Sequence, residues 1–160
     1  MPIRKFEKGD LQPLSEIVRA TNVFRPEEIE VAVELMDIVV ENPEDKDYFL
    51  YTFVDTSQTV RGYYCVGPTP MTVSTYDLYW IAVDPTAQGK GVGHQLIGHC
   101  EALVKSMGGT LVMVETSSQP KYDATNVFYK RHQYVEAARV KDYYSPGDDL
   151  IVYSKHLQEE

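Results

Sequence analysis

Three glycines alternate with other residues in the segment Gln88-Gly89-Lys90-Gly91-Val92-Gly93, just before a stretch of helical periodicity. Because glycine has no Cβ, the backbone of this segment can approach a phosphate group closely. The free N–H groups and the dipole at the start of the following helix favour an anion at the same place. Lys90 adds a positive charge, and His94 follows the loop closely enough to touch a phosphate. The segment therefore predicts a loop that binds a diphosphate.

The spacing of these glycines distinguishes three kinds of diphosphate loop. The nucleoside-triphosphate loop Gly-x-x-x-x-Gly-Lys-Ser/Thr does not occur here. A dinucleotide loop needs Gly-x-Gly-x-x-Gly directly after a strand, whereas here the spacing is Gly-x-Gly-x-Gly and residues 84–88 intervene. Glu115, at the end of the next predicted strand, partly mimics the ribose-binding acid of dinucleotide proteins, so this weaker interpretation stays open. The third pattern, Gln/Arg-x-x-Gly-x-Gly/Ala after a strand ending in Val-x-Pro, fits residues 83–93 at every position.

Residues 83–93 closely resemble the coenzyme A pyrophosphate loop of the GNAT superfamily of N-acetyltransferases. Residues 126–134 are similar to the second motif of that family, in which an apolar residue precedes a tyrosine, here Tyr129. Gln133 and Tyr134 stand where the family usually has Gly and Phe. Together the two motifs cover residues 77–135, and neither of them identifies an acceptor.

One coenzyme contact of the family is altered in this chain. The family's Asn, seven residues before the motif tyrosine, is replaced by Tyr122. Asn126, one helical turn before Tyr129, is the residue expected to substitute for it.

The resemblance implies an enzyme that transfers an acetyl group from acetyl-CoA, as cosubstrate and without a metal, to a primary amine. In such enzymes the strand before the loop offers backbone N–H groups to the pantetheine and the reacting carbonyl. By position, these groups belong to Ile81, Ala82 and Val83. Tyr129 matches the family's general acid, which protonates the leaving thiolate. Asp77 and Glu115 are alternative candidates for the base, acting directly or through water.

The two cysteines, Cys65 and Cys100, lie in predicted apolar elements and are expected to be inert. Direct attack of the amine in a ternary complex is therefore favoured over an acyl-enzyme. His99, His132 and His156 are expected on the surface.

The acceptor site is the least defined part of the prediction. In this fold it is built by the first helices and the late loops, which offer Phe24, Arg25, Glu28, Tyr143, Tyr144, Asp148 and Asp149. An acidic run from Glu27 to Asp47 has two interpretations: a helix face that meets water, which we favour, or a field that attracts a cationic amine.

Two further classes of function remain open at this stage. The chain could be an acyl-CoA-binding regulatory module without catalysis, because the family's Asn and Gly are missing. It could also be a dinucleotide-binding oxidoreductase. Thiol release in the presence of amines distinguishes the enzyme from the module, and titration with NADH detects the oxidoreductase.

Composition excludes several other classes. The chain has 160 residues and a formal net charge of −9, which argues against a nucleic-acid surface of clustered Lys and Arg. No apolar stretch approaches the ~20 residues that a membrane helix needs. The cysteines and histidines show no metal-ligand spacing, and two isolated cysteines suggest a reduced, cytoplasmic protein. The oligomeric state is left open, with a homodimer as one option.

The order of predicted elements gives the fold class. Residues 77–83, 92–107 and 110–114 form a strand–helix–strand unit, which predicts one parallel strand pair. Runs at 48–54 and 60–66, and at 135–142 and 150–155, read as antiparallel hairpins, and residues 2–6 as a short strand. Helices are expected around Leu11 to Val18, from Pro26 to the Asn42-Pro43 pair, and over 124–131 with Asp123 as its cap. The prediction is an α/β fold of the GNAT type: a single domain over 1–160 with a mostly antiparallel mixed sheet flanked by helices.

Overall fold

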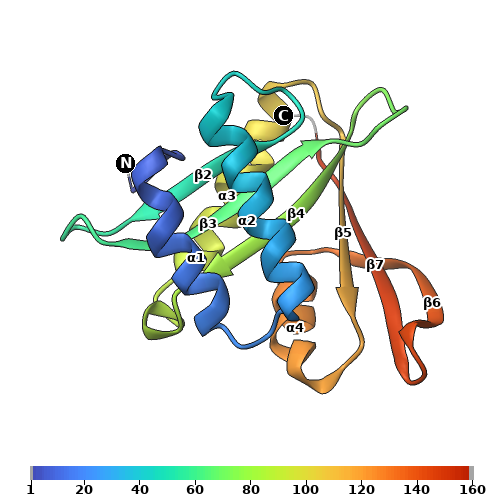
Figure 1. The fold of residues 1–160 in the computed structure, drawn as a ribbon. Coiled ribbons are helices and arrows are strands. Elements are labelled where there is room, and N and C mark those ends of the chain that lie inside the picture. Colours follow the sequence, from blue (N-terminus) through green and yellow to red (C-terminus); the bar gives the residue numbers. More distant parts are fainter. Residues whose placement is uncertain (1, 159–160) are drawn as a thin grey trace.

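The computed structural model describes residues 2–158 of the chain (Figure 1). The longer helices are α1 (Leu11–Ala20), α2 (Pro26–Glu41), α3 (Val92–Ser106) and α4 (Asp123–Arg131). The strands are β1 (Ile3–Lys5), β2 (Phe49–Val54), β3 (Val60–Pro68), β4 (Thr75–Val83), β5 (Leu111–Ser117), β6 (Val135–Ser145) and β7 (Asp148–His156). No helix among the described residues is both long enough and apolar enough to span a membrane.

All seven strands form one sheet in the order β1-β2-β3-β4-β5-β7-β6. Among the strands of residues 2–158, only β4 and β5 are parallel, and α3 is the crossover between them, while every other neighbouring pair is antiparallel. This topology confirms the predicted fold class.

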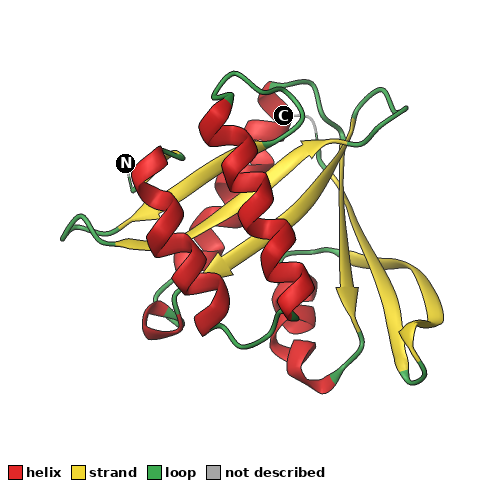
Figure 2. Cartoon of the chain, viewed as in Figure 1, coloured by secondary structure: helices red, strands yellow, loops and turns green. Residues whose placement is uncertain are grey.

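Helices cover both faces of the sheet (Figure 2). The pair α1 and α2 packs on one face, around the fully buried side chains of Leu14, Val18 and Met36. On the other face, Leu96, Cys100 and Val104 of α3 pack against β3, β4 and β5. The amphipathic pattern of α3 therefore places its first turn, with the glycine loop, at the C-terminal end of β4.

A β-bulge in β4 opens the centre of the sheet. Trp80 lies opposite Cys65 and Leu78 lies opposite Val66, so Tyr79 is an extra residue with no partner on β3. Such a bulge bends its strand and increases the local twist. From Leu78 onward β4 no longer pairs with β5, since the parallel ladder covers only residues 75–77. The two strands diverge from there, as Figure 1 shows.

Three local predictions need correction. The N-cap of α4 is Tyr122 rather than Asp123, which is the first helical residue and makes no capping hydrogen bond. Asp123 still lies in the first turn, where the helix dipole favours an acid. His99 is half-buried, with its Nδ1 atom 2.6 Å from the Tyr64 hydroxyl, and His132 is also half-buried. His99 lies at the edge of the apolar stripe of α3, one turn from Leu96 and Leu103, where the rings of Tyr51 and Tyr64 cover it.

Candidate active site

The glycine loop has the geometry of an anion site. Gly91 is the residue before α3 and has φ +81°, a conformation that L side chains rarely adopt. No heavy atom lies within 4 Å of the position that a Cβ would take at Gly91, so its backbone faces open space. At Gly93 a Cβ would stand 3.0 Å from the Phe128 ring, so this glycine lets α3 approach α4 closely.

A groove of about 540 Å³ runs between this loop and α4, and we call it the loop groove. It brings together most of the residues that were predicted to bind the coenzyme: Ile81, Ala82, Val83, Gln88, Gly89, Gly91, Val92, Gly93 and His94. Its opposite wall includes Thr125, Phe128 and His132. Lys90 is exposed and lies outside this lining, on the other side of the loop.

Two histidines connect the walls of the loop groove. His132 Nδ1 lies 2.8 Å from the Phe128 carbonyl, which can only accept, so this nitrogen carries the hydrogen. In the neutral form of this tautomer, His132 Nε2 accepts from His94 Nδ1, 3.1 Å away. The motif placed His94 here, but nothing in the sequence connected it with His132, because the contact depends on how α4 packs against α3.

A second cavity, of about 460 Å³, lies where β4 and β5 diverge, and we call it the acidic cleft. Its walls come from the start of α2, the two diverging strands, α4 and the β6–β7 turn. Five acidic residues are among those that line it: Glu27, Glu28, Asp77, Glu115 and Asp148. Phe24, Ile81 and Thr125 line both this cleft and the loop groove, so the two cavities meet at these residues.

Tyr129 lines the acidic cleft near this junction. Its side chain is only 4% exposed and packs against the rings of Phe128, Tyr134 and Tyr153. Residues 2–158 offer its hydroxyl no hydrogen-bond partner, which leaves the group free for a ligand. Burial raises the pKa of Tyr129 well above its usual range, so the phenol stays protonated.

The two candidate bases differ in their surroundings. Asp77 is half-buried, and burial raises the pKa of its carboxyl group above the usual value. A raised carboxyl pKa improves a base that works near neutral pH. Glu115 lies on β5 and is exposed. Both line the acidic cleft, so the structure brings the two candidates to the same cavity.

Of the described residues that line the acidic cleft, Arg25 is the one arginine, and its guanidinium is already paired. Arg25 Nε lies 3.1 Å from Glu28 Oε1, and the Tyr122 hydroxyl donates to the same oxygen at 3.0 Å. The guanidinium carbon of Arg25 also lies 5.0 Å from the centre of the Tyr144 ring. These side chains form one rim of the cleft.

The candidate acceptor residues divide into two groups. Phe24, Arg25, Glu28, Tyr144 and Asp148 line the acidic cleft, whereas Tyr143 and Asp149 lie outside its lining. Tyr122 and Trp80 belong to the cleft but were missed as acceptor-site residues. The sequence offered a signal for Tyr122, since it replaces the family's Asn, whereas no motif marked Trp80.

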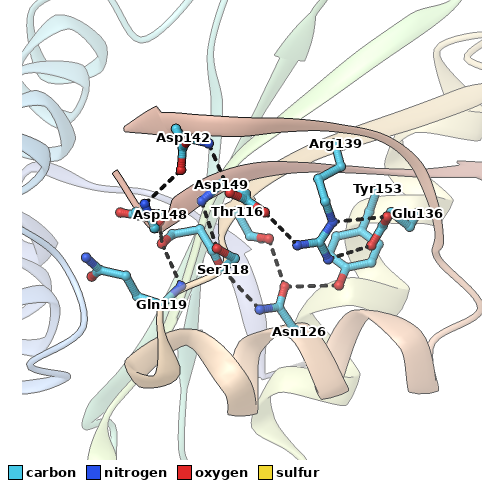
Figure 3. A network of polar contacts seen from close by, with 12 residues as sticks. Thr116, Ser118, Gln119, Asn126, Glu136, Arg139, Asp142, Asp148, Asp149 and Tyr153 are labelled. Atoms are coloured by element: carbon cyan, nitrogen blue, oxygen red, sulfur yellow. Dashed lines mark hydrogen bonds and ion pairs between the residues drawn. The ribbon is translucent and has the colours of Figure 1, made fainter. Parts of the chain in front are cut away.

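Asn126 has a different environment from the one expected. Its side chain bonds the Thr116 hydroxyl at 2.8 Å, the Ser117 carbonyl at 3.2 Å and the Tyr153 hydroxyl at 3.0 Å (Figure 3). It lies outside the lining of both cavities. The Asn126 amide therefore connects α4 to β5 and β7. Its position in the sequence, one turn before Tyr129, did not indicate that the side chain points toward these strands.

Neither cysteine is positioned as a nucleophile. Cys65 and Cys100 are fully buried, and burial raises the pKa of each thiol well above its usual range. Within residues 2–158, no group of three or more His, Cys, Asp or Glu side chains could hold a metal ion.

Comparison with known families decides how this pair of cavities is to be interpreted. Residues 45–136 match the model of the acetyltransferase (GNAT) domain, which is more than half of the chain. The chain belongs to the GNAT acetyltransferase family. It is an acyltransferase, and its glycine loop, the diverging strands and Tyr129 all lie inside the matched region. No curated protein is similar enough to count as a match.

Solved structures agree with this family membership. A protein from Desulfovibrio desulfuricans classed as an acetyltransferase of the GNAT family is 37% identical, with a TM-score of 0.88 over 96% of this chain and 97% of that one. An aminoglycoside 6'-N-acetyltransferase solved with coenzyme A is 19% identical, with a TM-score of 0.80 over 100% and 99% of the chains. The ribosomal-protein-S18-alanine N-acetyltransferase of Escherichia coli is 17% identical, with a TM-score of 0.76 over 99% and 94%. The last two share the fold with this GNAT chain.

Proposed function

We propose that this GNAT acyltransferase transfers an acetyl group from acetyl-CoA to a primary amine by direct attack in a ternary complex. The observation that carries the proposal is the meeting of two cavities at Phe24, Ile81 and Thr125, beside the largely buried Tyr129, whose hydroxyl has no hydrogen-bond partner within residues 2–158. One cavity suits a diphosphate and the other an acceptor, so donor and acceptor would meet at the same point.

The loop groove has the features that acetyl-CoA requires. The backbone at Gly91 and the start of α3 offers free N–H groups to a pyrophosphate. Beyond Asp77, the edge of β4 that faced β5 has lost its partner strand, so those amides of Ile81 to Val83 that point to this edge, every second one, are open to the pantetheine and the carbonyl oxygen. Asn126 is left out of this assignment, because its amide is held inside the protein.

Acetyl-CoA supplies an activated acyl group on a thiol leaving group. The chain's own residues would stabilise the developing charge and transfer the protons. Backbone N–H groups of β4 would stabilise the negative charge that develops on the carbonyl oxygen. Asp77, with Glu115 as the alternative, would accept the proton that the amine loses. The protonated Tyr129 would give its proton to the thiolate sulfur.

The buried cysteines support direct transfer over an acyl-enzyme. The neighbours act on aminoglycosides and on a ribosomal protein, so an amine acceptor is shared by the named activities. Their low identity leaves the acceptor of this chain to be argued from its own cleft.

The test is release of free thiol from acetyl-CoA by the purified protein, with and without a panel of primary amines. We expect thiol release that depends on the amine, and an acetylated amine by mass spectrometry. Acetyl-CoA alone and heat-treated protein are the controls. Tight binding of acetyl-CoA without any amine-dependent release would contradict the proposal and favour a regulatory acyl-CoA-binding module.

A further inference from the structure

The carboxylates of the acidic cleft are not equally engaged within the protein. Glu28 is paired with Arg25 and Tyr122, and Asp148 accepts a short hydrogen bond from the Ser117 hydroxyl. Among residues 2–158, Glu27, Asp77 and Glu115 have no ion-pair partner. The cleft therefore holds three uncompensated carboxylates, while its single guanidinium is already neutralised.

Three uncompensated carboxylates carry more negative charge than a single reacting amine requires. An amine attacks a thioester only as the neutral base, and nearby negative charge favours its protonated form. A cleft with three free carboxylates would therefore oppose the reaction of an acceptor whose only cation is the reacting group. The charge becomes an advantage when the acceptor carries a second cation that stays charged throughout.

The remaining walls of the acidic cleft suit the carbon skeleton of such an acceptor. Phe24 and Trp80 pack edge to face with ring centres 5.0 Å apart, and Tyr79, Tyr122 and Tyr144 line the same cavity. Aromatic faces accommodate methylene groups and attract ammonium groups. The unpartnered hydroxyl of Tyr129, on a side chain only 4% exposed, marks the end of this cleft where the acetyl group would be transferred.

We infer that the acceptor is a small polycationic amine: a primary amine that reacts near Tyr129 and carries at least one further ammonium group bound by Glu27 and Glu115. This inference rests on the proposed function and names the substrate class of its site. A cavity of about 460 Å³ is in the range of small-molecule sites and accommodates an aliphatic diamine or an amino sugar.

A matched series of four-carbon acceptors tests the charge requirement directly. The series is 1,4-diaminobutane, 4-aminobutan-1-ol, n-butylamine and 4-aminobutanoate, which differ only in the group at the far end. We expect kcat/KM to be at least about tenfold higher for the diamine than for butylamine, and lowest for the aminobutanoate. Raising the salt concentration should reduce the advantage of the diamine, because the carboxylates of Glu27 and Glu115 are exposed. A butylamine that reacts as well as the diamine would overturn the inference and leave acetyl transfer intact.

A matched pair of variants on α2 locates the second cation. Glu27 and Glu41 are both exposed glutamates of this helix, about 21 Å apart at 1.5 Å per residue. Glu27→Gln should lower the ratio of diamine to butylamine kcat/KM by about threefold or more. Glu41→Gln should leave this ratio unchanged. Glu41 lies much farther from Glu27 than the ~8 Å over which exposed charges act on one another in physiological salt. Equal ratios in the two variants would contradict the assignment of Glu27.

Binding measurements keep this inference separate from the proposed function. If no amine releases thiol, calorimetric titration of the protein, saturated with coenzyme A, still compares diaminobutane with butylamine. Stronger binding of the diamine would support the polycationic site even though acetyl transfer had failed. Equal or undetectable binding of both amines would overturn the site as well. Amino sugars with two or more amines, tested beside the aliphatic series, identify which skeleton the cleft prefers.

Discussion

At the scale of single residues, Tyr129 links the packing of the molecule to its chemistry. The ring packs against three aromatic neighbours, Phe128, Tyr134 and Tyr153, which hold it beside the acidic cleft. Among the described residues, the Tyr129 hydroxyl has no hydrogen-bond partner. A proton donor needs both features, because geometry decides whether a weak acid can protonate a thiolate.

We predict that Tyr129→Phe lowers kcat while acetyl-CoA affinity changes little. The substitution keeps the ring packing and removes only the hydroxyl, and general acids typically contribute ~10²–10⁴-fold. Steady-state kinetics and calorimetry would measure the two effects. Tyr143→Phe is the control, since Tyr143 is exposed and lies outside the cleft lining. An unchanged kcat in Tyr129→Phe, with chemistry rate-limiting, would remove Tyr129 from the mechanism.

The pH profile should agree with the same assignment. A general acid works while it is protonated, so activity falls only as the pH rises through its pKa. Burial raises the pKa of Tyr129 above the phenol value of ~10, so its deprotonation should not reduce kcat below about pH 10. A loss of kcat near pH 8 that disappears in a Tyr129 variant would contradict this placement.

At the scale of elements, the start of α3 explains why the loop needs particular glycines. Gly91 and Gly98 belong to the same segment, and neither has an atom within 4 Å of a would-be Cβ. They differ in backbone conformation, since Gly91 has φ +81° and Gly98 lies inside the helix.

The same substitution should therefore have opposite effects at these two positions. Gly91→Ala forces a Cβ into the left-handed region and should destabilise the fold by about 1–2 kcal/mol. Gly98→Ala removes a flexible residue from a helix interior and should stabilise it by about 0.5–1 kcal/mol. Because 1 kcal/mol changes Tm by about 2–4 °C at this size, thermal melting measures both effects. Only Gly91→Ala should also weaken acetyl-CoA binding, and matching behaviour of the two variants would contradict the role of the loop backbone.

The elements were largely predictable, and the cleft between them was not. Hydrophobic periodicity defined α3 and its flanking strands, and the strand–helix–strand order implied the parallel pair. The bulge at Tyr79 depends on the register between β4 and β3, and no local pattern in residues 75–83 predicts it. Since the bulge separates β4 from β5, the sequence could place the glycine loop but not the shape of the acidic cleft.

Side-chain direction set the other limit on prediction. The motif singled out Tyr129, and the structure places this residue in the lining of the acidic cleft. Asn126 lies less than one turn away and points instead into the network with Thr116 and Tyr153. Which side of a short helix faces a ligand is decided by its packing partners, and these come from distant strands.

At the scale of the whole molecule, the acidic residues fall into two groups: many face water, and a few line the acidic cleft. The formal net charge is −9, and α2 carries much of the acid. Most of its acidic residues are exposed and lie outside the lining of the acidic cleft, which supports the interpretation of a helix face that meets water. Glu27 and Glu28, in the first turn, are the members of this run that reach the cleft.

The architecture also leaves the two parts of the sheet joined by a short ladder. Strands β1 to β4 form one side and β5 to β7 the other, and the parallel ladder between them spans only residues 75–77 of β4. The loop groove crosses this division, since its walls come from the end of β4, the start of α3 and α4. A ligand in the groove would therefore tie together segments that the sheet itself connects weakly.

We predict that acetyl-CoA raises the melting temperature and that NADH does not. A ligand at a hundred times its Kd stabilises the folded state by about 2.7 kcal/mol, since it binds the folded state alone. For a chain of this size, that corresponds to a rise of roughly 5–10 °C. Differential scanning fluorimetry at matched ligand concentrations would measure it, with coenzyme A expected to act like acetyl-CoA because the pyrophosphate contacts are shared. NADH is the informative control, because it also carries a diphosphate and would stabilise a dinucleotide site. An equal rise with NADH would mean that the loop recognises a diphosphate without selecting the pantetheine, and the open edge of β4 would then lose its assigned role.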